Sequence, residues 1–376
     1  MRTFSTLILC ATFASSAAAQ GTLSTQGFGY PAGGLSTHAE ALGGSIAEND
    51  PLSPINPADL TSWGRPGLYF QYDPEFRTLQ ANGNSDHTLT ARFPLISGAL
   101  NIGPRFTLGL SSTTFLDRTW ETSFTGYAHF QGGDSSLYNE RFSTDGAIND
   151  LRAGLSFAVL PTLSIGLAGH VLTGQNRLLI SRTFADTNFA LFSQASELSY
   201  SGHSVSGGIN WRPLPILSVG VSGDAGGTLH SFRNDTSLSS ARVPKRFGFG
   251  TVFGGVSGLL LSANAEWNGW SAMNGLAESE VKAVDGWDWG VGAEVRAPSL
   301  FGQEFPLRLG YRRRILPFEA SEAEVRETDY SLGLGIPVSR GRSRVDLSFM
   351  RANRTSALPD VQEHAWIMSF GFFVRP

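Results

Sequence analysis

The chain has 376 residues, a formal net charge of −4 and a charged fraction of 16%. Soluble domains usually contain about 25% charged residues and about 7% glycine, whereas 44 residues of this chain are glycine. The weak net charge gives no electrostatic reason to expect nucleic acid as a partner. The single cysteine is Cys10, so the chain beyond it has no disulfide, no cysteine-based metal site and no thiol nucleophile.

Residues 1–19 have the pattern of a secretory signal peptide. Arg2 supplies a positive charge, a short apolar run follows, and small residues end at Ala19, which predicts cleavage after that residue. The apolar run is too short to span a bilayer as a helix. We therefore expect a secreted chain that consists of an N-terminal part, 20–66, and a larger part, 67–376.

Alternation of apolar and polar residues with a period of two predicts β-strands along residues 67–376. Every second residue is apolar in 366–374 and in 287–295. Two long uncharged stretches, 155–174 and 247–265, contain proline or paired glycines at their centres, which indicates two strands joined by a turn rather than a helix. Fourteen strands are expected, near residues 67–73, 87–96, 104–116, 149–160, 162–183, 197–212, 215–233, 243–254, 257–270, 285–297, 305–316, 327–338, 342–354 and 361–375.

The connections between these strands alternate in length. Six are short and seven are longer, and the longest is expected near 117–148. Short periplasmic turns and long outer loops are typical of bacterial outer-membrane barrels. A soluble β-sandwich shows the same alternation, but the secretion signal, the strand lengths and the aromatic last strand favour an antiparallel transmembrane β-barrel in the bacterial outer membrane. Its apolar faces then contact lipid and its polar faces line the lumen.

Residues 27–63 do not alternate and precede the first strand. They contain a run of small residues at 39–44, a polar step at 48–50 and the box Asn56-Pro57-Ala58. This segment resembles the N-terminal segment of FadL/TodX-type outer-membrane transporters and of the related PorV-like outer-membrane proteins. The sequence departs from the usual box at Asp59, where those families have glycine.

The resemblance implies that the N-terminal part is a hatch inside a barrel of about fourteen strands, and that hydrophobic substrate passes through a side opening in the wall. Four residues are expected to anchor this hatch: Asn49, Asp50, Asn56 and Pro57. Arg92 or Arg152 are expected partners for its polar side chains. Apolar contacts with a ligand are expected from Phe28, Tyr30, Leu35 and Leu42.

Motifs for catalysis are weak in this sequence. The histidines show no i, i+4 pair, and the run from Gly27 to Ala32 mimics a dinucleotide fingerprint only in its glycine spacing. His170 has two interpretations, a catalytic base or a hydrogen-bonded lumen residue, and the second is favoured. Lumen charges are expected to form either an anionic-group site or a salt-bridge network, with Arg152, Glu266, Glu294, Arg308, Arg312 and Arg314 as candidates.

The sequence therefore predicts a protein without enzymatic activity, cofactor or metal. Uptake of hydrophobic compounds such as long-chain fatty acids is the first hypothesis. A PorV-like anchor or shuttle, which binds proteins of a secretion system, is the alternative. Aromatic residues near strand ends are expected to form interface girdles, namely Tyr69, Trp211, Trp267, Trp270, Trp287, Phe318 and Trp366.

Overall fold

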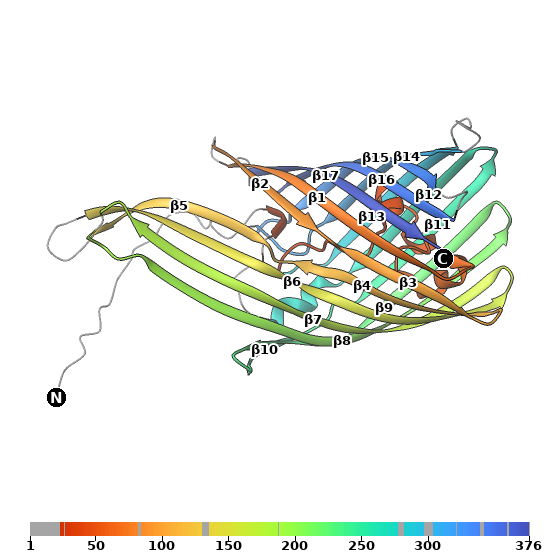
Figure 1. Ribbon diagram of the computed structural model, residues 1–376, viewed down its shortest axis with the longest axis horizontal. Coiled ribbons are helices and arrows are strands. Elements are labelled where there is room, and N and C mark those ends of the chain that lie inside the picture. The colour runs from red at the N-terminus through yellow and green to blue at the C-terminus, as the bar shows by residue number, and fades with distance from the viewer. Residues whose placement is uncertain are drawn as a thin grey trace.

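The computed structural model is a closed antiparallel barrel of fourteen strands whose first and last strands pair with each other (Figure 1). It describes residues 23–25, 27–81, 84–129, 135–186, 188–276, 282–296, 304–320, 322–338, 342–358 and 361–375. The predicted signal peptide lies outside these residues and stays a prediction. Within the described residues, no helix has the length and hydrophobicity needed to cross a membrane.

Seventeen strand segments make the fourteen barrel strands, because three strands are interrupted: β2 continues as β3, β4 as β5, and β10 as β11. Pro94 lies between β2 and β3, and Pro244 lies between β10 and β11; proline lacks the N–H that a strand needs. The segments are β1 (Gly67–Ala81), β2 (Asn84–Arg92), β3 (Leu95–Ile102), β4 (Phe106–Asp117), β5 (Trp120–His129), β6 (Ser135–Leu160), β7 (Leu163–Phe184), β8 (Phe192–Leu214), β9 (Leu217–Arg233), β10 (Thr236–Arg242), β11 (Arg246–Val256), β12 (Leu259–Asn268), β13 (Gly286–Arg296), β14 (Pro306–Ile315), β15 (Arg326–Val338), β16 (Ser343–Thr355) and β17 (Val361–Val374).

The prediction of a long loop at 117–148 is wrong, because β5 and the first half of β6 occupy most of this range. Here β5 to β8 continue beyond the other strands as a projecting sheet, called the outer sheet below (Figure 1). It comprises 120–129, 135–147, 175–184 and 192–198. Its outward face is polar, as in Asn139 and Arg141, so the apolar alternation used to find strands is weak there. The short connection expected at 97–103 is also wrong, because β3 extends to Ile102.

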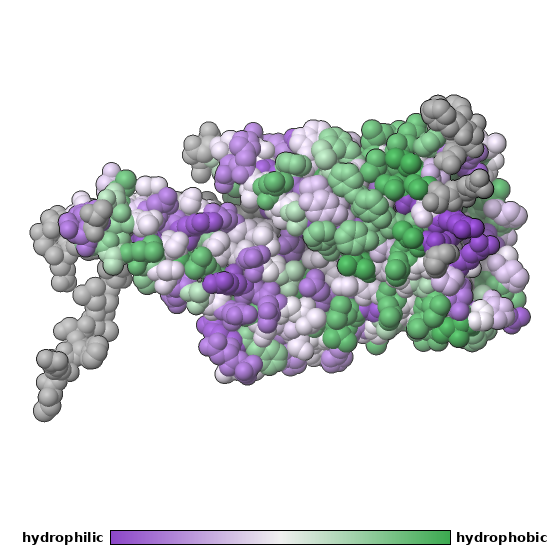
Figure 2. Space-filling view, in the orientation of Figure 1, coloured by the Kyte–Doolittle hydropathy of each residue, from purple (hydrophilic) through white to green (hydrophobic). Residues whose placement is uncertain are grey.

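The wall presents apolar side chains outward, as a membrane barrel requires. Leu167 is 73% exposed and Leu68 is 68% exposed, and outward residues of other strands follow the same pattern. Green, hydrophobic surface covers much of the barrel wall in Figure 2, whereas the outer sheet is more mixed. The alternation read from the sequence therefore has the orientation of a membrane barrel.

Residues 27–66 precede β1 and are called the N-terminal segment below; most of 27–60 packs against the inward side of the wall, whereas 64–66 are exposed. Its elements are a short helix, α1 (Thr37–Ala41), and two 3₁₀ turns, η2 (Ala47–Asn49) and η3 (Pro57–Trp63); a further turn, η1 (Leu23–Thr25), precedes it. Glycines of the wall allow its backbone to come close: a Cβ at Gly220 would collide with Glu48, and one at Gly310 with Gly43.

Candidate functional site

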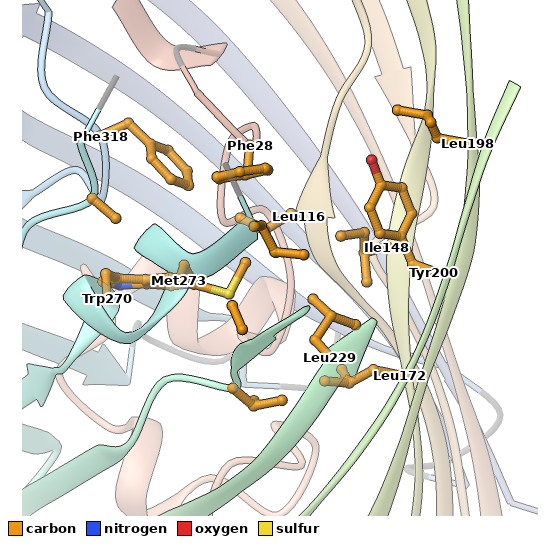
Figure 3. Close-up of a cluster of buried hydrophobic side chains, with 14 residues drawn as sticks. Phe28, Leu116, Ile148, Leu172, Leu198, Tyr200, Leu229, Trp270, Met273 and Phe318 are labelled. Carbon is orange, nitrogen blue, oxygen red and sulfur yellow. The ribbon is translucent and has the colours of Figure 1, made fainter. Parts of the chain in front are cut away.

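An apolar cluster fills part of the lumen on the side of the outer sheet. Barrel interiors are usually polar, so a buried apolar cluster at this place is unusual. Phe28 of the N-terminal segment packs against Phe318, with ring centroids 5.6 Å apart. Figure 3 shows these rings together with wall side chains and residues from a turn after β12. The buried members are Phe28, Leu116, Ile148, Leu172, Leu198, Tyr200, Leu229, Ala241, Val243, Trp270, Met273, Leu276, Ala283 and Phe318.

The turn after β12 is η4 (Trp270–Leu276), which supplies three members of the cluster. Its buried residues Trp270, Met273 and Leu276 are three residues apart, and that spacing places them on one face of a 3₁₀ turn. The expectation that Trp270, Phe318 and Tyr69 belong to interface girdles is therefore wrong, because all three are buried inside the barrel. The Trp270–Met273–Leu276 spacing is the sequence signal that could have identified this inward turn.

The cluster is continuous with the inner face of the outer sheet. Ile148 and Leu172 lie on the lumen side of β6 and β7, and every second residue of a strand shares one face. On the same faces, the two strands continue into the outer sheet with Tyr138, Phe142, Ile180 and Phe184. Apolar side chains therefore recur along this face, where they alternate with the polar pairs Glu140–Arg182 and Thr144–Asn176.

A polar cavity of about 160 Å³ adjoins the cluster. Leu172, Val243 and Trp270 line it together with the N-terminal segment and several charged wall residues. Arg152 lines it and donates from Nη2 to Asp150 at 2.9 Å. Within the described residues, Arg152 Nε and Nη1 are buried and have no hydrogen-bond partner. An unmet buried donor costs about 1–3 kcal/mol, which a bound acceptor would recover.

His170 also lines this cavity and is held by two neighbours. Its Nδ1 lies 2.9 Å from Asp150 Oδ2, and its Nε2 lies 2.7 Å from Ser206 Oγ. These three residue types resemble a hydrolytic triad, but Ser206 is buried on a paired strand and does not line the cavity. Its neighbouring backbone N–H groups belong to the strand ladder and are not directed at an oxyanion. The arrangement favours a fixed hydrogen-bond network over catalysis.

The wall has a gap on the side of the outer sheet. Among the described residues, β2 pairs only with β1, and β5 pairs only with β6. The two strand edges that face each other across this interval are therefore not joined. Tyr30 bonds at the inner end of the gap: its backbone N–H donates to Asp117 O, and Asp117 N–H donates to Tyr30 O, each at 2.8 Å. The N-terminal segment thus pairs with β4 where β2 departs.

The Tyr30 ring is surrounded by arginines rather than by apolar side chains. Arg92, Arg314 and Arg354 lie 5.3, 4.8 and 4.7 Å from the ring centroid. Its hydroxyl contacts Glu327, and all three arginines are paired with buried carboxylates. The structure places Tyr30 in a charged cage, which holds this part of the segment to the wall, and a ligand contact at Tyr30 stays a prediction.

The expected anchoring residues contact the wall in different ways. Asn49 Oδ1 accepts hydrogen bonds from Asn210 at 3.2 Å and Ser218 at 3.0 Å. Asn56 Nδ2 donates to Glu48 O and, at 3.2 Å, to Ile209 O, while its Oδ1 caps η3, which begins at Pro57.

Asp50 bonds within the segment, to Ser36 and Ser53. The expectation that Arg92 or Arg152 bonds these anchors is wrong, because both pair with wall carboxylates.

The other residues expected to contact a ligand lie in three different places. Phe28 belongs to the cluster and Leu35 lines the cavity. Leu42 is fully buried with Ala39 and Ile46 and does not line the cavity. Among the lumen charges, four pairs form in place of a cluster of free arginines: Glu294 with Arg308, Glu266 with Arg246, Arg308 with Asp346, and Arg312 with Asp288.

Within the described residues, no group of three or more histidine, cysteine, aspartate or glutamate side chains is arranged to hold a metal ion.

Solved structures with a similar fold include transporters and channels for hydrocarbons. The chain matches a FadL homologue of Pseudomonas aeruginosa with 13% identity, a TM-score of 0.58, and coverage of 90% of this chain and 98% of that chain. It matches the toluene transporter TbuX of Ralstonia pickettii with 13% identity, a TM-score of 0.58, and coverage of 92% and 99%. It matches the toluene transporter TodX of Pseudomonas putida with 12% identity, a TM-score of 0.54, and coverage of 90% of this chain and 98% of that chain.

No protein-family model and no curated relative matches the chain. The likeness thus concerns the fold, which is that of FadL/TodX-type channels.

Proposed function

We propose that this protein is a bacterial outer-membrane channel for the uptake of hydrophobic compounds, long-chain fatty acids among them, and that it performs no covalent chemistry. The observation that carries the proposal is the apolar cluster inside the lumen. A protein anchor does not require an apolar lumen, and an apolar lumen disfavours a water-filled pore. The cluster therefore favours passage of an apolar solute over the secretion-anchor alternative.

The route begins at the inner face of the outer sheet and continues into the cluster. A hydrophobic solute gains about 25 cal/mol for each Å² of apolar surface that leaves water, so contact with the apolar residues of this face, such as Phe142 and Ile180, is favourable before the lumen is reached. From the cluster, two exits are available. One is the gap between β2 and β5 at the base of the outer sheet; the other requires movement of the N-terminal segment, which acts as a hatch.

Arg152 supports an acid as one class of substrate. Its unmet Nε–H and Nη1–H groups point to different sides of the guanidinium, and a carboxylate at either one would form a charge-assisted hydrogen bond. The adjacent cluster accommodates the apolar part of the same molecule. A carboxylate at Arg152 would thus lie at the polar end of a ligand whose chain points toward Leu172.

The cluster is tested with Met273→Ser, because Met273 is a buried member of the cluster and η4 lies outside the barrel ladder. We expect weaker binding of both dodecanoate and dodecanol to the purified protein, measured by calorimetry in detergent. The control is Leu238→Ser on the exposed surface of β10. Unchanged binding in Met273→Ser would contradict the proposed route.

The acid preference is tested separately with Arg152→Gln. Binding of dodecanoate is expected to fall about 10- to 150-fold, as loss of a charge-assisted hydrogen bond worth roughly 1.5–3 kcal/mol implies, while binding of dodecanol stays unchanged. Equal affinity of the variant and the unmodified protein for dodecanoate would remove fatty acids from the proposal and leave neutral hydrocarbons.

A further inference from the structure

His38 connects the N-terminal segment to the barrel wall through both nitrogens of its ring. It lies on α1, whose first turn is capped by Ser36. Its Nε2 is 3.2 Å from Glu294 Oε2 on β13, and its Nδ1 is 3.6 Å from Asp50 Oδ1 within the segment. One ring thus faces two carboxylates that belong to different parts of the fold.

Both carboxylates already act as acceptors for other groups. Asp50 accepts hydrogen bonds from Ser36 Oγ at 2.5 Å and Ser53 Oγ at 2.6 Å. Glu294 accepts from Arg308 Nε at 2.8 Å. These donors favour the ionised form of each carboxylate, and an ionised carboxylate can only accept. Neither Asp50 nor Glu294 therefore supplies a proton to the ring.

The protonation state of the ring follows from this geometry. A neutral imidazole has one N–H and one lone pair, whereas the imidazolium has two N–H groups. Only the imidazolium can therefore make a favourable contact with Asp50 and Glu294 at the same time. In the neutral form, one of these contacts would bring a nitrogen lone pair toward a carboxylate oxygen.

Other charged groups around α1 do not replace this contact. Arg308 is shared between Glu294 and Asp346 on β16, and Asp346 is also bound by Arg344. Glu40 on α1 itself interacts with Asp73 of β1 and Arg312 of β14. Each of these cations already has its own carboxylate partner, so only the imidazolium of His38 can join Asp50 to Glu294.

We propose that His38 is a pH-sensitive tie that holds the N-terminal segment against β13. Histidine ordinarily changes its charge between pH 5 and 8. Contact with both carboxylates requires the imidazolium, so this tie is lost in the neutral form of the ring. Opening of the segment increases with pH, whatever compound the channel carries.

The test measures opening of the segment without any transported compound. Ser45 is buried in the segment close to β12, and Cys10 is the only native cysteine. The protein is prepared without residues 1–19, with Ser45→Cys, and reacted with a water-soluble maleimide at pH 5.5 and pH 8.0. The rate is divided by that of Ser237→Cys, an exposed site on β10, which removes the pH dependence of the thiol itself.

In the Ser45→Cys protein that retains His38, the corrected labelling rate is expected to rise at least threefold from pH 5.5 to pH 8.0. His38→Gln is neutral at both values, so its rate is expected to be high at both. His87→Gln on exposed β2 serves as the matched control and should retain the rise. Glu294→Gln removes only the wall partner and should also abolish the rise, which keeps the test valid if His38→Gln fails to fold. A corrected rate that is equal at the two pH values, or a rise that persists in both His38→Gln and Glu294→Gln, overturns the proposal.

Discussion

Gly43 allows a close approach between the N-terminal segment and β14 of the wall, and its substitution tests whether that approach keeps the lumen closed. Its φ is +64°, a backbone conformation that costs an L-residue about 1–2 kcal/mol. A Cβ at this position would lie 2.7 Å from the backbone N and O of Tyr311 on β14, whereas ordinary contact begins at 3.4 Å. The segment must therefore move by about 0.7 Å in Gly43→Ala, the difference between those two distances.

Gly64→Ala separates the two costs of that substitution. Gly64 has nearly the same φ, +65°, but nothing lies within 4 Å of the Cβ that alanine would add. Both variants therefore share the backbone strain, and only Gly43→Ala crowds the wall. Overpacking typically costs about 1–3 kcal/mol, which corresponds to a population of the open state roughly 5 to 150 times larger.

Planar-bilayer conductance of the two purified variants measures this difference. Gly43→Ala is expected to open more often than Gly64→Ala, while both keep the heat-modifiable migration of a folded barrel. If the two variants conducted equally, close packing of the segment on β14 would not be what closes the lumen.

Three further outcomes follow from the same structure. Phe249→Arg on the lipid face should cost about 2–4 kcal/mol of stability near the bilayer midplane, whereas Ser262→Asn on the lumen side should cost far less; denaturant unfolding in lipid vesicles compares them, and the reverse order would indicate a soluble β-sandwich. Tyr30→Ala should expose the N-terminal segment to protease, because each arginine–ring contact is worth about 0.5–2 kcal/mol; unchanged digestion would show that the cage does not hold the segment. Deletion of residues 21–57 should leave a folded barrel with high conductance, and low conductance equal to that of the intact protein would contradict the hatch assignment.

The sequence by itself determined the barrel and the orientation of its faces. Fourteen strands could be counted because alternation with a period of two is a local property, visible in stretches such as 287–295 without knowledge of any neighbour. The N-terminal segment could be separated from the barrel for the same reason, since 27–63 lacks that alternation. Residues 117–148 were misjudged, because strands outside a membrane do not need an apolar face.

Only the tertiary structure decided which aromatic residues face the lumen and which charges pair. Trp270 and Phe318 lie in connections, where alternation gives no direction, and they turn inward because η4 and Phe28 create an apolar site for them. Glu266 pairs with Arg246 rather than with a β14 arginine, because the register of β11 against β12 brings Arg246 within reach. The gap between β2 and β5 likewise depends on which strand edges remain unpaired, and pairing is a long-range property that no local pattern contains.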